Sequence, residues 1–402
     1  MTAATVPGAR PSVRTFRDSA LRVTGVIVVA ALTALAVWAI FHDLHDVIGR
    51  RAFLWALLFA FAPVLPLAAA FLWLDRMRPE PAKLLAVALL WGALAATYLS
   101  LKLNAWLAAQ VGDLHAASAR SAVFVAPWVE ETTKAAVIFA IVLWRRHDFN
   151  AVVAGVVYGG LVGIGFAFTE NIVYYGQLFQ QVYDGADKDA ALDAVRHLFF
   201  WRGMAAPFVH PMFTMMTGAG IGFAVRHRHV GVRILAPVAG FCAAALLHMG
   251  YNTIASFAVR EALTAVYVAI LLPTLLALVT IILVVRRHER SLVAARLHDY
   301  TAYGWLKPGQ IPYIAATRGR RAARRHAKQF GSAQRARVRE FQRDGTELGL
   351  VRDRIVRGVA GRNELPREAE LIAALREHRR HVLLPDGSCR SVDELSTAGS
   401  SW

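Results

Sequence analysis

The 402-residue sequence has few cysteines and few charged residues. Its two cysteines, Cys242 and Cys389, are too few for a disulfide scaffold or for a zinc site built on thiolates. Charged residues make up 18% of the chain and apolar residues 56%, against roughly 25% and 45–50% in an average soluble protein. This composition excludes an ordinary soluble enzyme.

The common nucleophile and nucleotide-binding motifs are also missing. The sequence has no Gly-x-Ser-x-Gly, no His-Glu-x-x-His and no Gly-x-x-x-x-Gly-Lys. Cys242 lies in a run of small apolar residues, which does not favour a reactive thiolate. Hydrolytic chemistry, if present, therefore has to use glutamate or a metal.

The positive charge is concentrated in the C-terminal part of the chain. The formal net charge is +17, and residues 286–402 hold 24 Lys and Arg against 13 Asp and Glu. The preceding 285 residues hold 21 against 15 and are mostly apolar. The sequence thus divides into an apolar part and a basic tail.

Eight apolar runs are long enough to cross about 30 Å of hydrocarbon as helices. They are residues 21–41, 52–74, 83–101, 121–144, 151–175, 201–225, 232–259 and 264–285. The sequence therefore predicts an all-α, polytopic membrane protein with about eight transmembrane helices and a polar C-terminal tail. We expect an N-terminal segment at 1–20, a membrane domain at 21–285 with a functional core at 120–259, and a tail at 286–402 that is partly helical or disordered.

The distribution of Lys and Arg indicates the orientation. With the N-terminus inside, residues 1–22 and the three short inner loops hold 12 Lys and Arg, and the outer loops and their margins hold eight. Cations are retained on the cytoplasmic side. We therefore expect a multi-pass protein of the cell's inner (plasma) membrane with both termini in the cytoplasm.

Four consecutive predicted spans carry the ionisable residues. A charge at the centre of a membrane helix costs at least about 2.5–3.5 kcal/mol, so such residues are candidates for function. Pairs spaced i, i+4 share one helix face. The pairs are Glu130 with Lys134, Phe166 with Glu170, His210 with Thr214, and His248 with Asn252, and Glu131 and Asn171 adjoin them. Counted from the span ends, they fall in one layer, where four faces can surround one polar cavity.

Two kinds of chemistry suit this set of residues. Adjacent glutamates in a low-dielectric pocket cannot both ionise cheaply, so Glu130 and Glu131 can serve as base and then acid on a water molecule that attacks an amide. Alternatively, Glu130, His210 and His248 match the ligands of a catalytic zinc site. The sequence leaves both open, and zinc is the only candidate cofactor.

These motifs resemble the PrsW family of intramembrane proteases, which belongs with the CAAX-processing and bacteriocin-processing membrane proteases. The resemblance rests on Glu130-Glu131-x-x-Lys134, Phe166-x-x-x-Glu170-Asn171, His210 with Thr214, and His248-x-x-x-Asn252, in that order. It implies an all-helical endopeptidase that cleaves membrane-associated proteins, among them anti-sigma factors.

The resemblance also implies roles for the single residues. Glu130 is the expected base and Glu131 its partner. His248 and Asn252 are the expected donors to the oxyanion, and Glu170 and His210 orient water or substrate. Lys134, Phe166, Asn171 and Thr214 are expected to support the site.

Two other classes of function remain open on sequence grounds. A proton-coupled transporter also uses intramembrane Glu, Lys and His, although the polar motifs do not recur as an inverted repeat and the glycines at 155–165 fit close helix packing better. A catalytically silent adaptor would work through the basic segment 318–343, which suits the surface of the lipid bilayer. Nucleic acid is a disfavoured partner because aromatic residues are sparse there.

Overall fold

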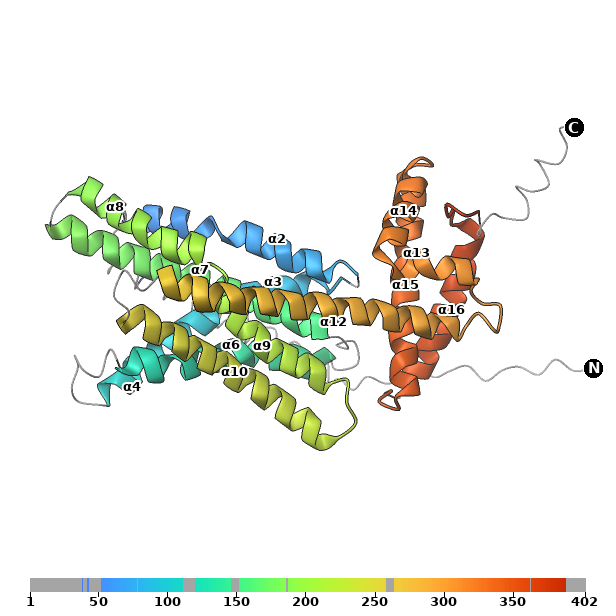
Figure 1. Ribbon diagram of the computed structural model, residues 1–402, viewed down its shortest axis with the longest axis horizontal. Helices are drawn as coiled ribbons and strands as arrows, with labels where there is room; N and C mark the ends of the chain where they lie inside the picture. The colour runs from blue at the N-terminus through green and yellow to red at the C-terminus, as the bar shows by residue number, and fades with distance from the viewer. Residues whose placement is uncertain are drawn as a thin grey trace, which may run out of the picture.

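The computed structural model describes residues 38, 42, 52–77, 79–110, 120–145, 152–185, 187–257, 264–361 and 363–387. Every regular element in these ranges is a helix. The helices form a long bundle and a second group that lies across one end of it (Figure 1). The predicted all-α class is confirmed.

The long bundle is built from elements between residues 52 and 298. The helix 82–109 is continuous through a π-helical turn, which forms η1. The elements are α2 (Val64–Asp75), α3 (Ala82–Leu90), η1 (Trp91–Ala96), α4 (Thr97–Ala109), α6 (Ala126–Arg145), α7 (Val152–Gly185), α8 (Lys188–Phe199), η2 (Phe200–Ala205), α9 (Val209–Ala224), α10 (Val230–Phe257), η3 (Tyr267–Leu271) and α12 (Leu272–His298).

Five described helices are long and apolar enough to cross a membrane. They are Ala52–Asp75, Ala82–Ala109, Val152–Gly185, Val230–Ser256 and Thr264–His298. They match the predicted second, third, fifth, seventh and eighth spans. The chain is therefore a multi-pass membrane protein. The predicted first span lies outside the described residues apart from Trp38, so the count of eight stays a prediction.

The predicted fourth and sixth spans are helical but differ from the other five. α6 carries charged residues in its interior, and α9 has only 16 residues. The prediction of one continuous span at 201–225 is wrong, because a turn at 206–208 separates η2 from α9. Ala206 precedes Pro207 and has a non-helical φ of −127°, as expected because proline disfavours the α conformation in the residue before it. His210 is consequently the second residue of α9 rather than the middle of a span.

Helix α7 lies at the centre of the bundle and packs closely against α9. A Cβ atom at Gly155 would lie 1.9 Å from the carbonyl oxygen of Gly218, and one at Gly163 would lie 2.6 Å from that of His210. The two backbones are therefore in direct contact, which confirms the close-packing interpretation of these glycines. This contact brings His210 next to the helix that carries Glu170.

The residues after α12 form a folded group that we call the tail bundle (residues 299–384). Its apolar side chains share a core, with Val338, Phe341 and Leu348 from one helix and Leu371 and Leu375 from another. Figure 1 shows its longer helices running across the axis of the long bundle. Its elements are η4 (Pro308–Gln310), α13 (Ile311–Ala315), α14 (Thr317–Lys328), α15 (Ser332–Val356) and α16 (Glu364–His381).

The tail bundle contacts the ends of two helices of the long bundle. Arg357 Nη1 donates to the carbonyl oxygen of Arg226 at 2.7 Å, just beyond α9. Arg320 Nη2 donates to the carbonyl oxygen of Met77 at 3.2 Å, just beyond α2. The tail bundle is therefore attached to the long bundle through more than the continuous helix α12.

Candidate active site

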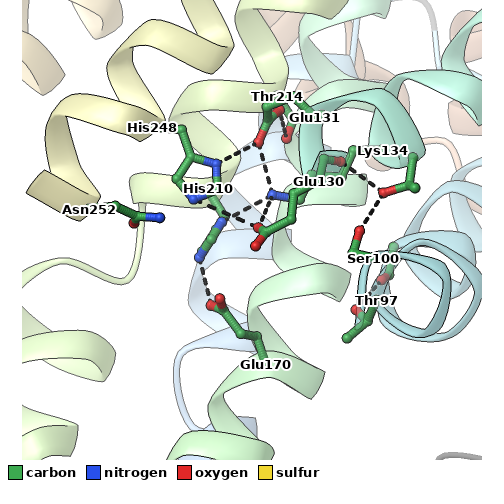
Figure 2. A network of polar contacts seen from close by, with 12 residues as sticks. Thr97, Ser100, Glu130, Glu131, Lys134, Glu170, His210, Thr214, His248 and Asn252 are labelled. Carbon is green, nitrogen blue, oxygen red and sulfur yellow. Dashed lines mark hydrogen bonds and ion pairs between the residues drawn. The ribbon is translucent and has the colours of Figure 1, made fainter. Parts of the chain in front are cut away.

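Helix α6 places two adjacent carboxylates and one ammonium group inside the bundle (Figure 2). Glu131 and Lys134 are fully buried, and Glu130 is 7% exposed. Lys134 Nζ lies 2.8 Å from Glu131 Oε1 and 3.3 Å from Glu130 Oε2. Because an unpaired buried charge is costly, Lys134 compensates much of the cost of burying the two glutamates.

Histidines from α9 and α10 close the site on the other side. His210 Nε2 lies 2.8 Å from Glu170 Oε2 of α7, and its Nδ1 lies 3.2 Å from Lys134 Nζ. His248 Nδ1 lies 3.2 Å from Glu131 Oε1, and its Nε2 lies 3.7 Å from Glu130 Oε2. We refer to these residues together as the polar cluster: Glu130, Glu131, Lys134, Glu170, His210 and His248.

If both histidines are neutral, the contacts select one tautomer for each ring. An ammonium group only donates, so His210 Nδ1 accepts from Lys134 and its Nε2–H donates to Glu170. A carboxylate only accepts, so His248 Nδ1–H donates to Glu131. Each histidine therefore turns one N–H toward a carboxylate and keeps one lone pair on the ring nitrogen that faces the middle of the polar cluster.

Three neighbouring side chains hold the polar cluster in place. Thr214 donates to Glu131 Oε2 at 3.0 Å, which gives this carboxylate a third donor. Lys134 Nζ lies 3.7 Å from the centroid of the Phe166 ring, as in a cation–π contact. Phe213 stacks on the His248 ring with 4.8 Å between centroids. Phe213 was not predicted, since an aromatic residue in an apolar helix gives no signal of its own.

Helix α6 is also fixed from the side of η1 and α4. Thr133 accepts at its carbonyl oxygen from Trp91 Nε1 at 2.9 Å, and its hydroxyl lies 2.7 Å from that of Ser100. A π-helical turn is often found at functional sites, and η1 is the turn that carries Trp91. These contacts position the turn of α6 that carries Lys134.

Glu130, His210 and His248 fit a metal ion. One ligand atom from each can be chosen so that all three lie within 4.8 Å of one another, and all three residues are buried. The carboxylates of Glu131 and Glu170 orient the two histidines, as carboxylates that accept from the other ring nitrogen do around zinc-binding histidines. The ammonium of Lys134 lies 3.3 Å from Glu130 Oε2 and 3.2 Å from His210 Nδ1, so it would have to withdraw if these atoms bound a metal.

Comparison with known proteins identifies the family. Residues 80–279 match the model of the PrsW family of intramembrane metalloproteases. Through this region, the chain belongs to the PrsW family. No curated protein and no solved structure matched it.

The family match extends well beyond the predicted core at 120–259. It contains η1 and α4 on one side and reaches into α12 on the other. The chain is thus an intramembrane protease by family, which favours this class over the transporter and the adaptor. The structure brings the predicted residues Glu130, Glu131, Glu170, His210 and His248 together, and their catalytic roles stay a prediction.

Arg202 is a functional candidate that the sequence did not reveal. Its Nη2 donates to Glu170 Oε2 at 2.5 Å, and its Nε donates to Asn171 Oδ1 at 2.8 Å. Its guanidinium also lies 4.1 Å from the ring centroid of Tyr174. Asn171 therefore supports the site by holding this arginine. In the sequence, Arg202 is the second residue of the apolar run 201–225, and nothing there indicates its partner on α7.

Asn252 lies at the edge of the site and is only partly covered. Its Nδ2 donates to the backbone carbonyl oxygen of Ala122 at 2.9 Å. Figure 2 shows the side chain beside His248, on the same face of α10, without a bond to the polar cluster. The i, i+4 spacing placed Asn252 correctly on this face, and its predicted role as an oxyanion donor stays a prediction.

Proposed function

We propose that the chain hydrolyses peptide bonds in membrane proteins with water activated at the polar cluster, and that Glu130, His210 and His248 hold a zinc ion there. The observation that supports this most directly is the pairing of each histidine with its own carboxylate, which leaves His248 Nε2 facing Glu130 and His210 Nδ1 facing Lys134. A bound zinc ion supplies Lewis acidity that polarises a peptide carbonyl and acidifies water.

The charges of the described site support the binding of a cation. Three carboxylates, those of Glu130, Glu131 and Glu170, face two permanent cations, those of Lys134 and Arg202. With neutral histidines, one negative charge remains uncompensated in a buried place. A metal ion or a bound proton has to supply the missing positive charge. The bound proton corresponds to the glutamate mechanism. The two mechanisms therefore differ in whether the protein contains a metal ion, which can be measured.

The residues of the chain have distinct tasks in this proposal. Glu131 accepts from Lys134, Thr214 and His248, which holds it as a carboxylate that orients His248. Glu170 does the same for His210 and is itself held by Arg202. Glu130 has fewer partners and faces His248 Nε2. It is therefore the residue available to bind the cation or to take a proton from water.

We further propose that the substrates include membrane-anchored regulators such as anti-sigma factors. Support for this comes only from the resemblance to the family, in which such substrates are cleaved within or beside the membrane. The proposal predicts cleavage of a substrate at a position at or near its membrane-spanning segment.

We also propose that the protein resides in the plasma membrane with the tail bundle in the cytoplasm. The tail bundle contacts the ends of α2 and α9, next to the arginine-containing loops assigned to the inner side. An excess of Lys and Arg in short loops is typical of that side.

Glu130→Gln tests the proposed function. We expect this variant to insert normally and to lose cleavage of a membrane-protein reporter by about 10²–10⁴-fold, because a neutral amide can neither take a proton nor bind a cation well. His248→Ala should be nearly as damaging. The matched control is Glu340→Gln on the exposed face of α15, which should cleave at the wild-type rate. Wild-type activity of Glu130→Gln would contradict the assignment.

A further inference from the structure

Arg286 is a buried guanidinium group without a hydrogen-bond partner in the described part of the chain. It lies on α12 near the tail bundle and is 2% exposed. None of its three nitrogens has an acceptor among the described residues. An unsatisfied buried polar group destabilises the fold, and a charged group does so more strongly. A ligand that brings acceptor atoms would remove this destabilisation.

Arg286 lines a cavity between the two bundles. The cavity has a volume of about 50 Å³, and α2, α7, α12 and α15 contribute to its wall. Arg290, one turn further along α12, also lines it, and its Nε likewise lacks a partner. One water molecule needs roughly 10–15 Å³ of such space, so the cavity takes a group of about four or five heavy atoms, which is the size of a phosphate.

The indole of Trp73 orients two guanidinium groups at this place. Arg286 Cζ lies 4.5 Å from the centroid of the Trp73 ring, and Arg76 Cζ lies 4.9 Å from the same centroid. Stacking uses the face of a guanidinium and leaves its in-plane N–H donors available. The donors of Arg286 are therefore held in one orientation by a contact that does not consume them.

Further arginines lie near the cavity, with Arg76 just after α2 and Arg320 and Arg321 on α14 of the tail bundle. Burial lowers the pKa of Arg76, and the neighbouring guanidinium groups of Arg321 and Arg290 lower it further. Burial likewise lowers the pKa of Arg320, with Arg76 and Arg290 among its cationic neighbours. Cations from α2, α12 and α14 thus repel one another here, and an anion would relieve this repulsion.

The carboxylates of the cavity wall interact with other groups. Asp75 accepts from the backbone N–H of Glu80 at 2.9 Å. Glu80 Oε2 accepts from the Tyr158 hydroxyl at 2.9 Å, and Glu289 lies 3.6 Å from Arg226. No ion pair between these carboxylates and Arg286 is described, so Arg286 keeps its donors for another group.

From these observations we propose that the cavity at Arg286 binds a phosphate group, either that of an anionic lipid headgroup or a free phosphate anion. Arg286 is the main donor and Arg290 assists it, because a guanidinium matches phosphate oxygens with two parallel hydrogen bonds. A lipid source is consistent with the exposed apolar side chains of Leu72 on α2 and Leu283 on α12, two of the helices that line the cavity. The lining of this cavity shares no residue with the polar cluster.

The test measures binding of two phosphate sources to the full-length protein in neutral detergent. Phosphatidylglycerol and inorganic phosphate are titrated separately, and binding is followed by native mass spectrometry and by the shift in Tm. Arg286→Gln should weaken binding about tenfold or more, since it removes the buried donors. Arg287→Gln is the matched control, because it removes the same charge from the adjacent, exposed position and should bind like the wild type.

Each outcome decides the proposal. Binding of phosphatidylglycerol alone identifies a lipid headgroup, and comparable binding of inorganic phosphate identifies a free anion; both support the site if Arg286→Gln loses it. Absence of binding of both probes to the wild type, or equal binding by Arg286→Gln, overturns the proposal. If Arg286→Gln does not fold, Arg286→Lys replaces it with Arg287→Lys as its control, and equal affinity of these two variants overturns the proposal as well.

Discussion

Lys134 is the residue whose position would differ between the two proposed mechanisms of hydrolysis. Its ammonium lies 3.3 Å from Glu130 Oε2 and 3.2 Å from His210 Nδ1, and both residues belong to the set that would hold a zinc ion. The same ammonium is 2.8 Å from Glu131 and rests on the Phe166 ring. A flexible lysine can keep the latter contacts while it moves away from the former. Metal binding and the buried ion pair are therefore compatible.

Glu170→Gln tests whether the Glu170 carboxylate orients His210 for metal binding. A neutral amide accepts more weakly from His210 Nε2 and presents an N–H₂ group that can face it, so the ring loses its fixed orientation. We expect zinc affinity to fall about 10–100-fold, measured by competition with a chelator of known affinity. Asp193→Asn, a similar change in an exposed ion pair, should leave the affinity unchanged. Unchanged zinc affinity in Glu170→Gln would show that this carboxylate does not orient His210 for metal binding.

The sequence predicted the site residues that are ionisable and lie within an apolar helix. Glu130, Glu131, Lys134, Glu170 and His210 stand out because ionisable groups are costly in such surroundings. Arg202 gave no such signal, because its burial depends on the fold of η2 against α7. Side-chain partners across helices depend on packing, which the spacing of residues in one helix does not encode.

At the scale of elements, the contact between α7 and α9 determines whether the site forms. These helices supply Glu170 and His210, and their backbones touch at glycines. Gly155→Ala should destabilise the fold by about 1–3 kcal/mol through overpacking, although alanine favours a helix more than glycine does. Thermal unfolding in detergent measures this.

Gly231→Ala on α10 is the control for the glycine contact. A Cβ atom at Gly231 meets nothing within 4 Å, so the same change should be neutral or stabilise the helix by up to about 1 kcal/mol. The two variants are therefore expected to differ in sign. Equal stability of both would show that the close approach of α7 and α9 is not required.

The starts of the long helices were predicted closely, whereas their ends and the break at 206–208 were not. The runs at 52–74 and 151–175 became long helices with nearly the expected starts. At 201–225 hydrophobicity continues through Pro207 while the helix does not, since the backbone of Ala206 leaves the helical region. Hydrophobicity alone does not separate a helix from two helices joined by an apolar turn.

At the scale of the whole molecule, the tail bundle is a second folded unit with its own apolar core. Phe341→Ala should destabilise this bundle by about 3–5 kcal/mol, because it deletes a fully buried aromatic side chain. Hydrogen exchange should show lost protection in the tail bundle and retained protection in α7 and α9. Phe330→Ala, at a position that is 54% exposed, is the control and should change little. Unaltered protection in Phe341→Ala would contradict the existence of this core.

The polar composition of the tail gave no indication of its apolar core. Arginine is so frequent there that the average character is polar, and a buried arginine such as Arg320 looks like a surface residue in the sequence. Arg320 Nη1 donates to the carbonyl oxygen of Ile314 at 2.8 Å, and such contacts become visible only when the helices are placed. The periodicity of residues within a single helix therefore could not predict how much of the tail is folded.

The central claim, that the polar cluster of this PrsW-family protein is a zinc-dependent hydrolytic site, is tested most directly by metal content measured together with cleavage. The full-length protein should contain one zinc ion per chain, lose cleavage of a membrane-protein substrate when a chelator removes the zinc, and recover it when zinc is restored. Undiminished cleavage by protein shown to be free of metal would contradict the claim and assign the chemistry to Glu130 and Glu131 alone.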